Sequence, residues 1–181
     1  MNKELFKITD SPKLKTSDIL AECRTLFPVY YYWSNEELDK NFPPPKKKTT
    51  RYFEKNVEAD EEYKNMSADD LGDTGIERGI TLRERLLMEL QYFKEIGKHL
   101  DIKNITLCSG SRFEGGHVPS VHWPLGGRLD VYWYGPDFRR EHLRSRQAVL
   151  PSNLETQDSN LKSRIKELEN FRSKVEKVLK L

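Results

Sequence analysis

The longest regular hydrophobic pattern of the chain lies between Thr81 and Leu100. Apolar residues recur there at spacings of one, three and four positions, which is the pattern of one face of an α-helix. They are Leu82, Leu86, Leu87, Leu90, Phe93, Ile96 and Leu100. Thr81 and Glu84 form a capping-box pattern, in which each side chain bonds the other residue's backbone amide. The pattern predicts a helix over residues 82–99 whose apolar face packs on the segments that follow.

From residue 105 onward the hydrophobic period changes to two, which is typical of strands. The alternation predicts strands over residues 105–108, 118–123 and 129–134. The sequence Pro-Leu-Gly-Gly at 124–127 predicts a hairpin turn, because glycine adopts the positive φ angles that tight turns need. A glycine-rich phosphate loop is disfavoured, because such a loop leads into a helix and this one leads into a strand.

The N-terminal part of the chain begins without a regular pattern. Residues 1–15 show no periodicity and predict a flexible terminus. A capping residue at Thr16 or Ser17, followed by apolar residues at helical spacing, predicts a helix that extends to residue 27. Pro28 then ends this helix, because proline lacks the amide hydrogen that a helix interior needs.

Shorter elements follow. The aromatic run at residues 29–33 favours an extended segment. We expect its side chains to be packed in the interior, with an aromatic ligand platform as the alternative. Ser34 and Glu37 predict the start of another helix, and three prolines followed by three lysines at 43–48 predict an exposed loop. Ser67 begins a further helical turn, after which glycines loosen the chain.

Residues 151–181 are expected to form a helical tail. Apolar residues recur every seven positions there, and Ile165 and Leu179 lie between them. The repeating residues are Leu154, Leu161, Leu168 and Val175. Packing back onto the domain and self-association as a short coiled coil through residues 154–179 are equally favoured, because the number of clean heptads is small. The elements together predict an α+β fold, with a single domain over residues 16–150 ahead of the tail.

Composition and charge argue against several functional classes. Of the 181 residues 33% are charged, and no apolar run reaches the roughly 18 residues that a membrane-spanning helix needs. The first residues, Met-Asn-Lys-Glu, lack the apolar block of a secretory signal, so we expect a cytoplasmic protein with no membrane partner. The net charge of +2, from 31 basic and 29 acidic residues, argues against a dedicated nucleic-acid-binding protein.

Few side chains are placed for catalysis or metal binding. Cys23 and Cys108 lack the spacing of a zinc site or a disulfide framework, and we expect both to be buried. Cys108, His122 and Asp130 lie on adjacent predicted strands, which makes a Cys-His nucleophile the weakest of the functional alternatives. His117 and His122 are five residues apart and would lie on opposite faces of a strand, which disfavours a shared metal. We expect a non-enzymatic protein without a metal or cofactor.

The predicted strands alternate between a packed face and an exposed face. The residues expected on the exposed face are Ser120, His122, Arg128, Asp130, Tyr132 and Tyr134. Such side chains supply adaptable contacts, as in antibody loops, and an ordinary solvated sheet face is the alternative. No lysine occurs between Lys103 and Lys162, although lysine is abundant elsewhere. The candidate ligand-contact residues are Phe113, His117, Ser120, His122, Arg128, Asp130, Tyr132, Tyr134, Asp137 and Phe138.

Four segments carry a resemblance to a known family. They read TLCSGSR at 106–112, VPSVHW at 118–123, LDVYWY at 129–134 and LRSRQAV at 143–149. With these segments, the region 81–150 resembles the C-terminal part of C-type-lectin-like domains. More closely, it is similar to the variable proteins of bacterial diversity-generating retroelements. The resemblance implies a small antiparallel sheet of C-type-lectin-like character, packed on the long helix.

In that family, framework residues alternate with positions that adenine-directed mutagenesis rewrites. The usual codons give Tyr, His, Ser, Asp, Arg, Gly, Phe, Leu and Pro but not Lys, Glu, Gln, Met or Trp, and the exposed face fits this alphabet. The resemblance implies that Trp123 and Trp133 are framework, and so are Glu114 and Glu141. It also implies a hypervariable surface for protein recognition. A sugar ligand is disfavoured, because the segment lacks the several oxygen ligands that calcium needs.

A nucleic-acid-associated protein is the second functional hypothesis. The basic side chains that support it are Arg139, Arg140, Arg144 and Arg146, with Lys46, Lys47 and Lys48. The tail adds to them, since Lys162 to Lys180 contains seven basic and three acidic residues. Binding through these groups would weaken steeply with salt.

Overall fold

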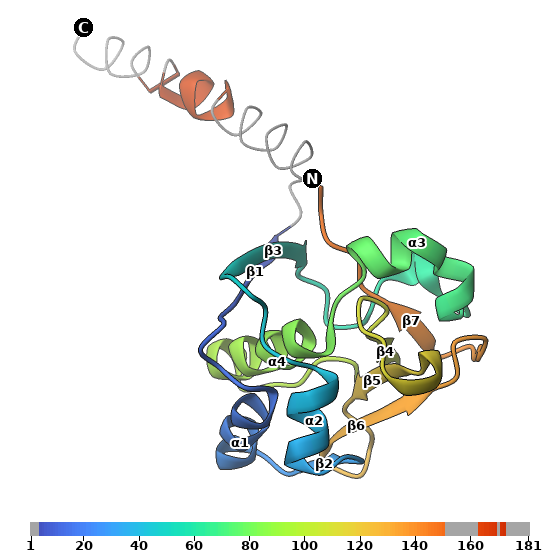
Figure 1. The fold of residues 1–181 in the computed structure, drawn as a ribbon. Helices are drawn as coiled ribbons and strands as arrows, with labels where there is room; N and C mark the ends of the chain where they lie inside the picture. Colours follow the sequence, from blue (N-terminus) through green and yellow to red (C-terminus); the bar gives the residue numbers. More distant parts are fainter. Residues whose placement is uncertain (1–3, 151–162, 170, 173–181) are drawn as a thin grey trace, which may run out of the picture. The chain divides into compact units, whose positions relative to one another are not determined.

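The computed structural model describes residues 4–150, 163–169 and 171–172 (Figure 1). The chain divides into two units. One is Lys3–Ala148, and the other consists of Met1–Asn2 with Val149–Leu181. The first unit contains both helices and strands, so the predicted α+β class is confirmed.

The main sheet has five strands in the order β2, β6, β5, β4, β7 (Figure 1). They are β2 (Val29–Tyr31), β4 (Ile105–Leu107), β5 (Val118–His122), β6 (Leu129–Tyr134) and β7 (Leu143–Ser145). The predicted hairpin joins β5 and β6, and β4 also pairs antiparallel with β5. The edge strands β2 and β7 instead run parallel to β6 and β4. The prediction of an antiparallel sheet is therefore correct only for the three central strands, because both edge strands arrive through longer connections.

A second sheet contains only β1 (Leu5–Asp10) and β3 (Thr49–Glu54), which pair antiparallel. Phe6 lies opposite Phe53 in this ladder, and both side chains are buried. The prediction of a flexible terminus over residues 1–15 is wrong for β1. Its apolar side chains pack against a strand far along the chain, and a local sequence pattern does not show such a partner.

The first unit also contains four α-helices, which pack around these sheets (Figure 1). They are α1 (Thr16–Leu26), α2 (Asn35–Asn41), α3 (Ala68–Arg78) and α4 (Leu82–Ile96). Ser34 and Thr81 form the capping boxes of α2 and α4, as their sequence patterns predict. Ser67 forms a further capping box, with Asp70, at the start of α3. Helix α3 is longer than the predicted turn, because Gly72 accommodates a kink at φ +52° and the helix continues beyond it.

The apolar pattern predicts that helix α4 extends to residue 99, but the helix ends at Ile96. Gly97 adopts the left-handed conformation at φ +70°, and its amide donates a hydrogen bond to the carbonyl of Phe93. The chain leaves the helix axis there. The ring of His99 then stacks on that of Trp123, with ring centroids 3.3 Å apart.

Helix α4 contributes to two apolar cores. Leu82, Leu86 and Leu90 belong to the core between the helices and the main sheet, whereas Met88 and Tyr92 pack with β1 and β3. Cys23 and Cys108 are buried in the first core without a disulfide, as predicted. A helix buried on two sides in this way fixes the spacing of the two sheets.

The tail is described only in part. Residues 163–169 and 171–172 are helical, within the predicted tail. Most of the predicted seam at 154–179 lies outside the described residues, and so does the self-association inferred from it. None of the helices in the described part of the chain is long and apolar enough to cross a membrane.

A buried charged network connects α4 to the main sheet. The carboxylate of Asp101 accepts hydrogen bonds from Arg85 Nε at 2.9 Å and from Arg146 Nη2 at 2.7 Å. It also accepts one from the hydroxyl of Thr106, and Arg85 donates to Glu89 at 2.8 Å. Burial alone would raise the pKa of Asp101, but the Arg146 and Arg85 guanidinium groups outweigh it and hold that pKa below its usual range. The carboxylate is therefore charged although it is fully buried.

We expect Asp101→Asn to lower the free energy of unfolding at pH 7 by roughly 3–5 kcal/mol, because the buried Arg146 guanidinium loses its carboxylate partner and Arg85 keeps only Glu89. Urea unfolding measures this loss. Since the folded-state pKa is depressed, the contribution of the carboxylate is present above its unfolded pKa of about 3.9 and is lost as the pH falls below it. The control Asp73→Asn, at an exposed position, should change stability by less than about 0.5 kcal/mol. An equal loss in both variants would contradict the network's role.

Asp60 has the opposite pH dependence. Burial raises its pKa to about 6, although the amide of Gln147 donates to its carboxylate at 3.0 Å. A carboxyl group with a raised folded-state pKa stabilises the fold below its unfolded pKa, and this contribution is lost as the pH rises through about 6.

Asp60→Asn should therefore stabilise the protein at pH 8 by about 1–2 kcal/mol and have a much smaller effect at pH 4. The asparagine carbonyl can still accept the hydrogen bond from Gln147. Urea unfolding at both pH values tests this, with exposed Asp137→Asn as the control. Equal destabilisation of Asp60→Asn at both pH values would disprove the assignment.

Candidate ligand-binding surface

Two neighbouring strands bring three exposed tyrosines together at one edge of the main sheet. β2 pairs with β6 so that Tyr30 lies opposite Asp130. Because side chains alternate along a strand, Tyr30, Asp130 and Tyr132 share one face, and Tyr32 directly follows β2. The side chains of Tyr30, Tyr32 and Tyr132 are 44%, 56% and 41% exposed. We call the group Tyr30, Tyr32, Arg128, Asp130 and Tyr132 the tyrosine surface.

The members of the tyrosine surface hold one another in place. The rings of Tyr32 and Tyr132 meet edge to face, with centroids 5.7 Å apart. The Arg128 guanidinium lies 4.7 Å from the centre of the Tyr30 ring, and Arg128 Nε donates to Asp130 Oδ1 at 2.7 Å. Cation–π contact and a charge-assisted hydrogen bond thus orient the arginine before any ligand binds.

An aromatic layer supports these tyrosines. Trp133 lies nearly parallel to Tyr132, with an interplanar angle of 10°, and contacts Tyr32 edge to face. Phe113 and His117, two predicted contact residues, pack against Trp133 with centroid distances of 6.2 and 4.4 Å. Both are partly buried, so they support the surface and form little of it.

Ser120 does not face solvent. It is 1% exposed, and the prediction that it belongs to an exposed face is wrong. Leu107, Val118 and Leu143 of the three strands β4, β5 and β7 pack with Ala68 at the start of α3. Helix α3 therefore covers this part of the sheet, and a strand's own alternation does not reveal such a covering element.

Tyr134 and Phe138 form a stacked pair beside that covered region. Their ring centroids are 4.6 Å apart, and both rings pack against the small core beneath α3. Burial raises the pKa of Tyr134. Neither residue extends the tyrosine surface as an exposed anchor, although both are predicted contact residues. Asp137, between them, is exposed.

His122 is half-buried and lies opposite Asp130 in the β5–β6 ladder. Burial lowers its pKa below the usual value, which outweighs the opposite effect of the Asp130 carboxylate. The imidazole is therefore neutral at pH 7. Arg128 and Asp130 set the charge of this surface at that pH.

Tyr30 and Tyr32 are contact candidates that the sequence pattern misses. The aromatic run at 29–33 is expected in the interior, yet only Trp33 of the run is fully buried. Alternation within the run is the available signal, because Tyr30 and Tyr32 fall on one side of an extended segment and Trp33 on the other. The pairing of β2 with β6 places Tyr30 on the same face of the sheet as Asp130 and Tyr132.

The four arginines of the nucleic-acid hypothesis do not share one exposed surface. Arg146 is buried in the network described above. Arg144 is partly buried and paired with Glu61, so only Arg139 and Arg140 are exposed. Phosphate contacts need free cationic side chains. Arg139 is paired with Asp70 at 2.7 Å, so only Arg140 of these four has no acidic partner among the described residues.

The Cys-His alternative lacks an activated thiol. Cys108 is fully buried, and burial raises the pKa of its thiol. A protonated thiol is a poor nucleophile. Among the described residues, no group of three or more His, Cys, Asp or Glu side chains is arranged to hold a metal ion.

No model of a known protein family, no curated protein and no solved structure matches this chain.

Proposed function

We propose that the chain is a non-catalytic binding protein that recognises a protein partner through the tyrosine surface. The observation that carries the proposal is the exposure of three tyrosines: Tyr30 and Tyr132 on two paired strands, and Tyr32 directly after the first of these strands. Tyrosine and arginine are the residue types most enriched where binding energy concentrates in protein interfaces. Three exposed aromatic rings grouped in this way offer a partner protein a large apolar contact area.

Preorganisation supports the same proposal. A tyrosine has two χ angles, so ordering it on binding costs little conformational entropy. Tyr32 and Tyr132 already contact each other, and Trp133 backs both. Tyr132 and Trp133 lie on β6, and a strand holds side chains more firmly than a loop does, which lowers the entropic cost of association.

The charge of the surface suggests how a partner is oriented. Arg128 lies over Tyr30 and is bonded to Asp130 through one nitrogen, which leaves its two Nη groups free to donate to a ligand. A carboxylate or backbone carbonyl of the partner can accept from them. We propose a partner that combines an apolar patch over the tyrosines with such an acceptor at Arg128.

We further propose that the domain is C-type-lectin-like and is the variable protein of a diversity-generating retroelement. On β6, Asp130 and Tyr132 belong to the tyrosine surface, and both residue types are in the alphabet of mutable codons. The inward positions of β6 end on Trp133, which those codons exclude. Tyr30 and Tyr32 precede the region 81–150 and would be a constant part of the surface.

Alanine at both Tyr32 and Tyr132 should weaken partner binding at least tenfold while the thermal midpoint changes little, because the truncated rings are exposed. Partners are captured from the source organism's lysate on the immobilised wild-type chain. The captured protein is then purified and titrated against each variant. Ile76→Ala, at an equally exposed apolar position on α3, is the matched control. Unchanged affinity of the double tyrosine variant would refute the assignment of the surface.

The retroelement proposal has a separate test in the surrounding DNA. We expect a reverse transcriptase gene beside a near-copy of the segment that encodes the later strands. Differences between the two copies should fall at adenines and at codons for outward residues such as Asp130 and Tyr132. A locus without either feature would remove the variable-protein proposal and leave the binding proposal standing.

A further inference from the structure

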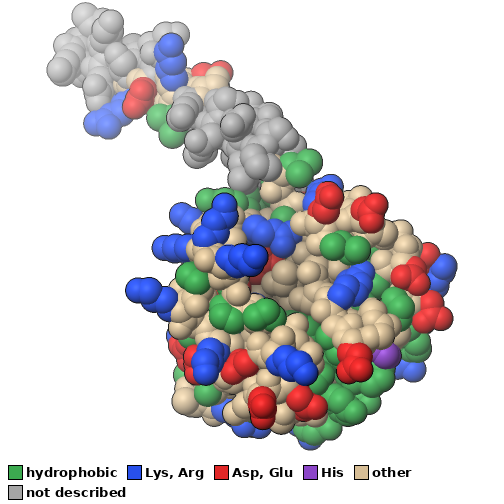
Figure 2. All heavy atoms as spheres, in the orientation of Figure 1, with side chains coloured by type: hydrophobic (Ala, Val, Ile, Leu, Met, Phe, Trp, Pro, Cys, Tyr) green, Lys and Arg blue, Asp and Glu red, His purple; other side chains and the backbone are tan. Residues whose placement is uncertain are grey.

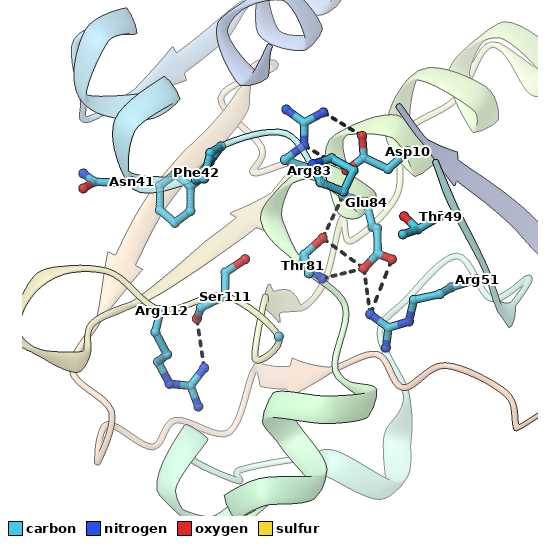
Figure 3. A pocket seen from close by; sticks show the side chains of 13 residues that line it. Asp10, Asn41, Phe42, Thr49, Arg51, Thr81, Arg83, Glu84, Ser111 and Arg112 are labelled. Carbon is cyan, nitrogen blue, oxygen red and sulfur yellow. Dashed lines mark hydrogen bonds and ion pairs between the residues drawn. The ribbon is translucent and has the colours of Figure 1, made fainter. Parts of the chain in front are cut away.

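A hollow of about 380 Å³ lies at the start of α4, and none of its lining residues belongs to the tyrosine surface (Figure 3). The end of β1, the end of α2, strand β3 and the loop after β4 surround it. Its volume falls within the range of roughly 300–1,000 Å³ that is usual for small-molecule sites.

The hollow has an apolar side and a polar side. Phe42, Pro43 and Pro45 form the apolar side, and Figure 3 shows Phe42 across the hollow from Arg51. Ser111 contributes a hydroxyl group whose oxygen accepts a hydrogen bond from the Leu82 amide at 3.0 Å. The hydroxyl hydrogen of Ser111 is therefore available to donate to a ligand.

A close glycine contact fixes the loop after β4 against the start of α4. The Gly110 amide donates to the carbonyl of Ile80 at 3.1 Å. A Cβ atom at Gly110 would lie 2.2 Å from the carbonyl oxygen of Gly79, so only glycine fits there. This contact places Ser111 and Arg112 at the hollow.

The two carboxylates at the hollow are already neutralised. Arg83 donates to both oxygens of Asp10, at 2.8 and 2.6 Å. Glu84 accepts from Arg51 at 3.0 Å and from the hydroxyl and amide of Thr81, each at 2.9 Å. Two of the three arginines that line the hollow, Arg51 and Arg83, are thus ion-paired with carboxylates.

The third arginine, Arg112, has no carboxylate partner among the described residues. Within the described part of the chain, no carboxylate lies within ion-pair distance of it, and Nη1 donates only to the carbonyl oxygens of Ser109 and Ser111. The guanidinium is half-buried, and burial lowers its pKa despite the more distant Asp69 carboxylate. A partly desolvated cation with free N–H groups is a site for an anion.

The chain adds further positive charge next to the hollow. Lys46, Lys47 and Lys48 follow Pro45 directly and are exposed, in the loop that their sequence predicts. Figure 2 shows Lys and Arg side chains gathered on this face of the molecule. Positive potential around a concave site attracts anionic ligands and speeds their association.

We propose that this hollow binds a small phosphate monoester with an attached ring. The phosphate accepts hydrogen bonds from Arg112 and from the Ser111 hydroxyl, near the positive end of the α4 dipole. The lysines after Pro45 strengthen its attraction, and the ring packs on Phe42 and the neighbouring prolines. A phosphate fits better than a monoanion, because it can accept from several of these donors at once.

The test is calorimetric titration of the full chain with phenyl phosphate, which carries both parts of the proposed ligand. Phenol carries the ring alone, and inorganic phosphate carries the anion alone. We expect phenyl phosphate to bind at least tenfold more tightly than either and to weaken as salt rises. Arg112→Gln should reduce its affinity at least tenfold. Arg140→Gln, at an exposed arginine outside the hollow, should change it less than twofold.

Where Arg112→Gln does not fold, the triple change Lys46→Gln, Lys47→Gln and Lys48→Gln in the exposed loop replaces it. That variant should bind phenyl phosphate several-fold more weakly at an unchanged thermal midpoint. Absence of phenyl phosphate binding up to about 10 mM would overturn the proposal. So would equal affinity for either partial probe, or full affinity in every variant. The double change Tyr32→Ala and Tyr132→Ala should leave this binding intact, so the two proposals fail independently.

Discussion

The buried carboxylate of Asp101 joins segments that are far apart along the chain. Through Arg85 it holds α4, and through Arg146 it holds the segment that follows β7. The other N–H groups of Arg146 donate to the carbonyl oxygens of Asn56 and Val57, which fixes the chain after β3. A buried charge without partners costs several kcal/mol, so the segments assemble only where both arginines reach this carboxylate.

The backbone of Asp101 also joins distant segments. The residue adopts a left-handed conformation, at φ +55°, in the turn after α4. Its amide donates to Val57, and its carbonyl accepts from Trp123 at the end of β5. The hydrogen bonds of its amide, its carbonyl and its carboxylate together offset the strain of this conformation. The turn thereby sets the position of the β5–β6 hairpin relative to α4.

Helix α4 consequently positions both candidate sites, but for opposite kinds of ligand. The tyrosine surface lies on β2 and β6, is open to solvent, and is backed by Trp133. The hollow lies at the start of α4, is concave, and is lined by Arg112, which has no carboxylate partner in the part of the chain that the structure describes. Flat aromatic surfaces suit protein partners, whereas a concave cationic site suits a small anion. Helix α4 belongs to the apolar cores of both sheets, so the same helix stabilises the fold and supports the elements that carry the two candidate sites.

The sequence by itself determined the features that depend on neighbouring residues. The capping boxes at Ser34 and Thr81, the helix start at Ser67, the β5–β6 hairpin and the end of α1 before Pro28 follow from interactions within a few positions. Alternation along β6 also assigned Tyr132 correctly to solvent.

Only the tertiary structure decided what a distant segment covers or pairs with. Strand β1 exists because β3 pairs with it, and Ser120 is buried because α3 lies over its part of the sheet. Tyr30 joins Tyr132 because Val29 pairs with Leu129 across a hundred positions of sequence. The hollow likewise forms from five separate segments. Such contacts depend on the summed burial and charge pairing of the whole domain, which no local pattern of residues encodes.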